Sequence, residues 1–153
     1  MPRSWSFEAA VDAPPDAVYA WMTDYREDDH ANADFRRGAG VSTEDRAHSH
    51  RVVERKDATH LVVRDEWGRE KFELHVELAP AAREVRLSGA FGYGAVWRAE
   101  PAGAGTRVTV RGQLAPTGFA KLFAGLFAGR MEKQMRQDFH GHLAQMRAEL
   151  AKR

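Results

Sequence analysis

Hydrophobic and polar residues alternate along much of the chain, and this pattern predicts β-strands with one buried and one wet face. Residues 4–11 place apolar side chains on one face at a period of two. The same alternation recurs in six later segments separated by short breaks. These segments are 47–56, 59–67, 70–79, 83–91, 93–100 and 105–115. Short breaks favour hairpins between sequential neighbours, so we expect one antiparallel sheet of seven strands.

Two other segments have apolar residues at the three- and four-residue spacing of helices that bury one face. The first follows Pro14, Pro15 and Asp16, because proline and an acidic residue both suit the first helical turn. Its apolar face consists of Val18, Trp21, Met22 and Tyr25. We expect the polar stretch 24–38 to form a short second helix or a loop.

The second segment, residues 118–152, predicts a long C-terminal helix with one apolar stripe. The stripe contains Phe119, Leu122, Phe123, Leu126, Phe127, Met131, Met135, Phe139, Leu143, Met146 and Leu150. Glycine weakens a helix, and Gly125 and Gly129 lie close together in its first half. We therefore expect a bend or an interruption within 125–130.

The start of this helix also contains a G-x-x-x-G pattern, which is informative only in an apolar segment of membrane-spanning length. A span needs about 20 predominantly apolar residues. Here only residues 122–129 are continuously apolar and uncharged, and Lys121 and Arg130 flank them. We predict that the protein has no transmembrane segment.

Composition narrows the class of protein. The 153 residues contain 23 Lys and Arg against 22 Asp and Glu, so bulk charge does not favour a nucleic acid partner. There is no cysteine, which excludes disulfides, thiolate metal ligands and a cysteine nucleophile. A chain of this length is expected to form a single domain, residues 1–153. The N-terminal residues lack the long apolar stretch of a secretory signal, so we expect the protein in the cytoplasm.

Four stretches carry a resemblance to a known group of proteins. They are VDAPPDAVYAWMTD (11–24), VVER (52–55), WRAEPAGAGTRVTV (97–110) and DFHGHLAQMRAEL (138–150). Together with the order of elements, they resemble the START-related (SRPBCC) superfamily, which includes polyketide cyclases, pollen-allergen-like binding proteins and lipid-transfer domains. The resemblance implies an α+β helix-grip fold, in which a curved seven-stranded antiparallel sheet wraps around a long C-terminal helix and two short helices separate strands 1 and 2.

The resemblance also implies an apolar cavity between the sheet and the terminal helix. Aromatic rings and flexible methionines suit an apolar ligand of irregular shape, although the same side chains could simply pack against each other. The expected lining residues are Trp67, Phe72, Leu74, Leu87, Phe91, Trp97, Phe123, Phe127, Met131 and Met135. We therefore expect a binding or carrier protein for a hydrophobic small molecule such as a lipid, quinone or polyketide, with no cofactor.

The first alternative is an enzyme of the polyketide cyclase or dehydratase kind. Such an enzyme would need a polar group in the cavity with a shifted pKa, and the candidates are His50, Asp65 and Tyr25, with Arg98 as a further one. Strand 59–67 could present either face inward; we prefer the face of Leu61, Val63, Asp65 and Trp67 because it buries the tryptophan. No Ser-His-Asp spacing, phosphate-binding glycine loop or H-E-x-x-H motif accompanies these residues.

The sequence is compatible with three other functions. His48 and His50 lie two apart on one strand and could bind a metal with His30, His60 or Asp65, but we favour a polar strand end and predict no metal. Basic residues outnumber acidic ones on the terminal helix, which could make transient contact with an anionic membrane, although a solvated face is favoured. A third function is a protein-interaction module of the chaperone-activator type.

Overall fold

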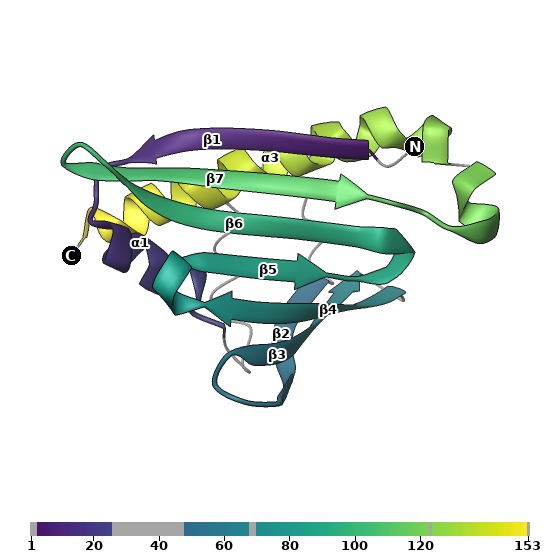
Figure 1. Ribbon diagram of the computed structural model, residues 1–153, viewed down its shortest axis with the longest axis horizontal. Coiled ribbons are helices and arrows are strands. Elements are labelled where there is room, and N and C mark those ends of the chain that lie inside the picture. The colour runs from purple at the N-terminus through teal and green to yellow at the C-terminus, as the bar shows by residue number, and fades with distance from the viewer. Residues whose placement is uncertain (1–2, 26–47, 68–69, 123, 153) are drawn as a thin grey trace.

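The computed structural model describes residues 3–25, 48–67, 70–122 and 124–152 (Figure 1). Its strands and helices follow the predicted order, and three short 3-10 turns lie between them. In chain order they are β1 (Arg3–Val11), α1 (Pro15–Met22), β2 (His48–Arg55), β3 (His60–Trp67), β4 (Glu70–Ala79), η2 (Pro80–Ala82), β5 (Glu84–Ser88), η3 (Ala90–Gly92), β6 (Tyr93–Ala102), β7 (Gly105–Leu114), η4 (Gly118–Leu122) and α3 (Ala124–Leu150).

The strands form one seven-stranded sheet in the order β1-β7-β6-β5-β4-β3-β2, with every neighbouring pair antiparallel. Five of its six neighbouring pairs are sequential strands, and β1 joins the far edge beside β7. The sheet curves, and α3 crosses behind it (Figure 1). The predicted α+β helix-grip fold is thereby confirmed. The second short helix or loop was expected over 24–38, and all of this stretch after residue 25 lies outside the described part of the chain.

Helix α1 begins where the prolines predict. Pro14 is the N-cap residue, Pro15 opens the helix, and the Pro14 carbonyl accepts a hydrogen bond from the Val18 amide at 3.0 Å. Asp16 in the first turn also pairs with Arg83 of the β4–β5 turn at 2.6 Å. Val18 is fully buried, so this short helix is held against the sheet by its apolar face.

The long helix departs from the prediction at its start. Residues 124–150 form one continuous α-helix, so of the bend or interruption expected within 125–130 the interruption is wrong. The chain instead turns at Gly118, with φ +64°, and forms the 3-10 turn η4 before α3 begins. A helical glycine costs only about 1 kcal/mol relative to alanine, which a helix of this length tolerates. No helix within the described residues is long and apolar enough to cross a membrane.

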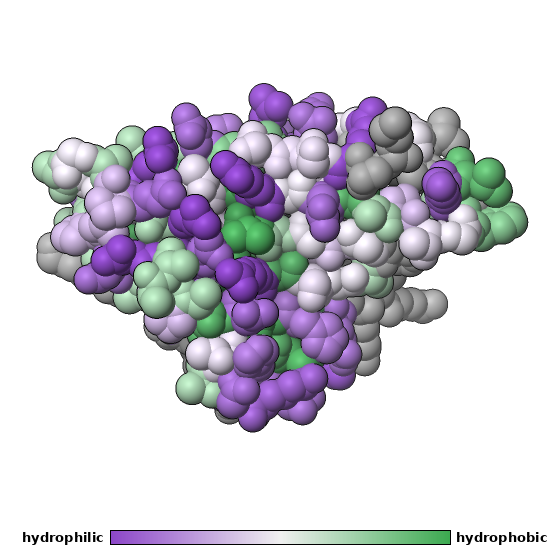
Figure 2. All heavy atoms as spheres, viewed as in Figure 1, coloured by the Kyte–Doolittle hydropathy of each residue, from purple (hydrophilic) through white to green (hydrophobic). Residues whose placement is uncertain are grey.

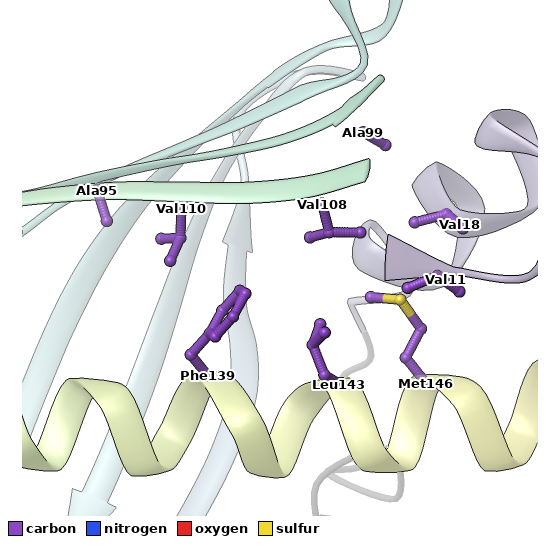
Figure 3. Close-up of a cluster of buried hydrophobic side chains, with 9 residues drawn as sticks. All are labelled: Val11, Val18, Ala95, Ala99, Val108, Val110, Phe139, Leu143 and Met146. Carbon is purple, nitrogen blue, oxygen red and sulfur yellow. The ribbon is translucent and has the colours of Figure 1, made fainter. Parts of the chain in front are cut away.

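The second half of α3 packs against one end of the sheet. Phe139, Leu143 and Met146 point from the helix toward β6 and β7 (Figure 3), and each is at most 1% exposed. We call this set the solid core; its buried members are Val11, Val18, Ala95, Ala99, Val108, Val110, Phe139, Leu143 and Met146. The small side chains of Ala95 and Ala99 therefore leave room that the helix fills, rather than room for a ligand.

The outer face of the sheet carries ion pairs instead of apolar contacts. Glu84 of β5 accepts hydrogen bonds from Arg98 of β6 at 2.7 Å and from Arg86 at 3.0 Å, while its own side chain is 5% exposed. Hydrogen bonds from Arg98 and Arg86 keep the pKa of Glu84 below its usual value in spite of this burial. Many hydrophilic side chains cover this face (Figure 2).

Candidate functional site

A second group of apolar residues covers the inner face of the other half of the sheet. We call it the inner wall; its buried members are Val52, Leu61, Val63, Val76 and Val85, from strands β2 to β5. Further hydrophobic side chains pack on it and are only partly buried: Tyr19, Met22, Tyr25, Leu78, Leu87 and Trp97. Partly buried apolar side chains of this size, gathered on one concave face, are the usual lining of a small-molecule site.

Four residues lie at the junction of the inner wall and the solid core. Tyr19, Met22, Leu87 and Trp97 pack against both groups, so they are positioned by β5, β6 and α1 together. The ring of Trp97 also lies 5.5 Å from that of Phe139, centroid to centroid. The junction is thus fixed on one side by the solid core and lined by aromatic faces on the other.

The hydroxyl of Tyr19 is the unusual polar group at this junction. Its oxygen is buried and has no hydrogen-bond partner within the described part of the chain. Burial raises the pKa of Tyr19 above its ordinary value, so the hydroxyl is neutral. Leaving a buried hydroxyl without a partner costs about 1–3 kcal/mol.

His142 lies beside the same junction, on the inward side of α3. Its ring centroid is 5.6 Å from that of Trp97 and 6.5 Å from that of Trp21, edge-on to the latter. Nδ1 lies 2.8 Å from the carbonyl oxygen of Asp138, which accepts the Nδ1 proton. In the neutral ring Nε2 is therefore the acceptor nitrogen.

A hydrogen-bonded clasp joins α1 to α3 at one end of the site. The indole Nε1 of Trp21 donates to Glu149 Oε2 at 2.7 Å, and Gln145 Nε2 donates to Glu149 Oε1 at 2.8 Å. Both oxygens of this carboxylate are thus held by neighbours from two helices. The clasp therefore fixes the position of α1 relative to α3.

The lining residues expected from the sequence fall into three groups. Leu74, Leu87, Trp97 and Met135 are partly buried. For five others the structure describes only the backbone: Trp67 in β3, Phe72 in β4, Phe91 in η3, and Phe127 and Met131 in α3. Phe123 lies outside the described residues. Of the expected lining, Leu87 and Trp97 pack on both the inner wall and the solid core.

The candidate acid–base residues occupy different places. His50 of β2 is paired in register with Asp65 of β3, and Asp65 with Phe72 of β4. Tyr25 packs on the inner wall, and its carbonyl accepts a hydrogen bond from Arg55 at 2.9 Å. Arg98 is wrong as a cavity residue: its guanidinium lies on the outer face with Glu84 and Glu100, because two carboxylates there attract it.

For the part that the structure describes, strand β3 turns the preferred face inward. Leu61 and Val63 are buried in the inner wall, at 2% and 0% exposure. Val62, on the opposite side of the strand, is also only 4% exposed. Burial on both sides explains why alternation in the sequence could not separate the two registers.

Among the residues considered for a metal site, the structure describes the side chain of His60 but not those of His48, His50 and Asp65. No group of three His, Asp or Glu side chains within the described residues could hold an ion. His60 is the first residue of β3, next to the β2–β3 turn. Its Nδ1 lies 2.9 Å from Asp57 Oδ1, and both side chains are more than half exposed. His75 of β4 is exposed, and His30 lies outside the described residues.

Sequence reasoning missed Tyr19 and His142. A signal for His142 was available, since Phe139, His142, Leu143 and Met146 follow the three- and four-residue spacing of the buried stripe. Tyr19 gave no such signal: it follows Val18 directly, and it packs against buried residues that come from distant strands.

The chain matches the model of one protein family, described as polyketide cyclase / dehydrase and lipid transport, over residues 4–151. A comparison with curated protein sequences gives no match.

Solved structures share the fold at low sequence identity. TTHA0849 from Thermus thermophilus is 20% identical, with a TM-score of 0.66 and 98% of each chain covered. The Zhui aromatase/cyclase from Streptomyces sp. R1128 is 16% identical, with a TM-score of 0.69 and 95% of this chain and 94% of that one covered. Ara h 8.0201 is 13% identical, with a TM-score of 0.66 and full coverage of both chains.

Proposed function

Because the chain belongs to the polyketide cyclase / dehydrase and lipid transport family, we propose that it binds a hydrophobic small molecule between the inner wall and helices α1 and α3. Family membership supports a role in binding a hydrophobic ligand or in polyketide cyclisation. The observation that carries the proposal is the buried, unpartnered hydroxyl of Tyr19 at the junction of two apolar groups within the described part of the chain.

Apolar burial supplies most of the affinity in this proposal. Side chains of Leu74, Leu87, Trp97 and Met22 are partly buried and available to cover a ligand. Each Å² of apolar surface removed from water contributes about 25 cal/mol before the costs of binding. The proposed lining extends to residues of β3, β4, η3 and α3, namely Trp67, Phe72, Phe91, Phe127, Met131 and Met135.

Tyr19 gives the ligand its orientation. A neutral tyrosine hydroxyl can donate a hydrogen bond to a carbonyl or accept one from a hydroxyl. The neighbouring aromatic face of Trp97 favours a flat, unsaturated ring over a single saturated chain. The ligand class that fits best is therefore a flat, largely apolar molecule with one or two oxygen substituents, such as a polyketide-derived aromatic or a quinone.

Native mass spectrometry of the protein purified from its own host tests the proposal. We expect a retained small-molecule mass, released on denaturation, with an elemental composition rich in carbon and containing oxygen. A protein that carries no such mass, and that also fails to bind flat oxygenated aromatics in a calorimetric screen, would contradict it.

The Tyr19→Phe variant tests the role of the hydroxyl. Loss of one hydrogen bond to the ligand weakens affinity by about 3- to 10-fold. The ligand-free variant should be at least as stable as the wild type, because the substitution removes a buried polar group that has no partner among the described residues. Tyr93→Phe is the matched control, since Tyr93 stacks on Trp5 at the β1 edge of the sheet, 6.4 Å between ring centroids; it should leave ligand affinity unchanged.

A cyclase or dehydratase activity is the second candidate. The observation that favours it is the register of β2 and β3, which pairs His50 with Asp65, an imidazole and a carboxylate of the kind used in general acid–base catalysis. His50→Ala and Asp65→Asn should then lower turnover of a polyketide substrate at least about 100-fold while ligand affinity changes little. Tyr25 is the third candidate acid–base residue, and Tyr25→Phe tests it in the same assay. Full turnover in all three variants would remove these residues from catalysis.

A further inference from the structure

The 3-10 turn η4 exposes two large hydrophobic side chains. Phe119 is 77% exposed and Leu122 is 73% exposed, and they are the exposed large hydrophobic residues of the part that the structure describes. Hydrophobic side chains gather at this end of the molecule, over η4, in the space-filling view (Figure 2). Gathered apolar surface of this kind marks a site of contact with another molecule or with a membrane.

The backbone holds η4 away from the rest of the fold. The turn lies beyond the end of β7, where the chain leaves the sheet and reverses into α3 (Figure 1). Gly118 adopts φ +64°, a left-handed conformation that glycine reaches readily, and a Cβ at this position would have no atom within 4 Å. Gly125, on the other side of the turn, likewise faces open space. Phe119 and Leu122 are thus presented on a narrow, convex tip.

Basic residues lie on and beside the tip although the whole chain is nearly neutral. Residues 108–131 contain no Asp or Glu, whereas they contain Arg111, Lys121 and Arg130. Lys121 lies within η4 and is exposed, and Arg111 is exposed on the neighbouring end of β7. Arg3, also exposed, pairs in register with Leu114, the last residue of β7.

We propose that η4 is a docking tip for bilayers containing anionic lipid, with Phe119 and Leu122 entering the interface and Lys121 remaining among the headgroups. Apolar insertion combined with electrostatic attraction to anionic lipid is the recognised basis of peripheral membrane binding. A lone convex tip of two side chains offers far less than the roughly 800 Å² per partner of a stable protein interface. A bilayer needs no matching surface, so it fits this tip better than a second protein chain does.

The tip also lies where a membrane would be useful to a ligand-binding protein. Residues 118–122 lead into α3, the helix that packs over the inner side of the sheet. A tip seated in a bilayer would bring the start of α3 next to the phase in which hydrophobic molecules are stored. Docking nevertheless stands apart from the proposed ligand site, because it depends on different residues.

Vesicle co-sedimentation of the full chain tests the docking tip. The probes are vesicles of phosphatidylcholine alone and of phosphatidylcholine with about 30% phosphatidylglycerol. We expect the wild type to bind the anionic vesicles at least about 10-fold more tightly than the neutral ones, and less tightly as salt is raised. The double variant Phe119→Ser, Leu122→Ser should bind the anionic vesicles at least about 10-fold more weakly, and Lys121→Gln about 2- to 5-fold more weakly.

The matched control is Ala81→Ser, Ala82→Ser in η2, an exposed 3-10 turn at the opposite end of the sheet. It should bind like the wild type. Equal binding of the η4 double variant and the wild type, or no wild-type binding to anionic vesicles, overturns the proposal. So does a wild-type dimer in light scattering that the η4 double variant abolishes without any vesicle binding. Ligand retention measured on the same samples reports on the ligand site separately.

Discussion

At the scale of single residues, close contacts decide which positions tolerate change. The register pairs Trp5 with Gly112, and the indole ring lies directly over the glycine. A Cβ at Gly112 would lie 2.2 Å from Trp5 Cε2, far inside van der Waals contact. Neither residue's role was readable from the sequence, because it depends on the pairing of the first strand with the last.

We predict that Gly112→Ala destabilises the protein by about 1–3 kcal/mol, since the indole must move out of a packed position. Gly129→Ala is the matched control: the helical position faces open space, so the same added methyl should stabilise by about 0.5–1 kcal/mol. Urea denaturation measures both. Equal effects of the two substitutions would contradict the packing of Trp5 over Gly112.

A second residue-scale prediction concerns the β2–β3 turn. Asp57 Oδ1 accepts hydrogen bonds from the Thr59 and His60 amides at 2.8 and 2.9 Å. The Thr59 amide and the His60 side chain lower the pKa of Asp57 from 3.8 to about 2. The carboxylate's contribution to stability is therefore complete above about pH 4 and is lost as the pH falls through about 2.

The Asp57→Asn variant should accordingly be less stable than the wild type at about pH 6, and the difference should shrink between about pH 4 and pH 2. Thermal unfolding across this range measures it. A difference that stays constant with pH would mean that the ionised carboxylate does not hold the turn.

At the scale of elements, the strand ends agree with the sequence pattern within a few residues. Alternation of apolar and polar residues predicts a strand that is buried on one face, and strands such as β4 and β7 have one buried and one wet face. The hydrophobic pattern gave the wrong or no answer where contacts with distant elements, rather than the two-residue period of a strand, decide which side chains are buried. Strand β3 is buried on both sides, and η4 replaces the expected break in the helix because Gly118, not Gly125 or Gly129, takes the left-handed conformation.

The clasp between α1 and α3 supports an element-scale prediction. Glu149→Ala removes the acceptor for Trp21 Nε1 and for Gln145 Nε2, so it should destabilise by about 1–2 kcal/mol. Glu132→Ala, on the same helix, removes an exposed ion pair with Arg136 at 3.5 Å and should cost less than about 0.5 kcal/mol. Urea denaturation compares them; a smaller loss for Glu149→Ala would show that the clasp does not join the helices.

At the scale of the whole molecule, the inner face of the sheet has two parts that differ in how fully they are buried. The second half of α3 fills the space over β1, β6 and β7 with the solid core, and the inner wall on β2 to β5 is edged by partly buried aromatics. The sequence indicated the fold and the aromatic character of the inner face. It could not locate Tyr19 or His142, since the partners of a polar group are a property of the folded whole.

The difference between the solid core and the inner wall predicts different losses of stability when a large side chain in each is replaced by alanine. Phe139→Ala should destabilise by about 3–5 kcal/mol, because the ring is 1% exposed and its centroid lies 5.7 and 5.5 Å from those of Phe7 and Trp97. Leu74→Ala on the partly exposed side should cost clearly less, while weakening ligand binding. Calorimetric unfolding and ligand titration of both variants separate the two effects; an equal loss of stability would mean that the inner face is one continuous core.

The central claim is that a hydrophobic ligand lies between the inner wall and the helices. Nuclear Overhauser contacts between the bound ligand and selectively labelled side chains test it most directly. We expect contacts to the Leu74 and Leu87 methyl groups and to the Trp97 indole, and none to Val108 in the solid core. Contacts confined to the outer face of the sheet or to η4, with none at Leu87 and Trp97, would contradict it.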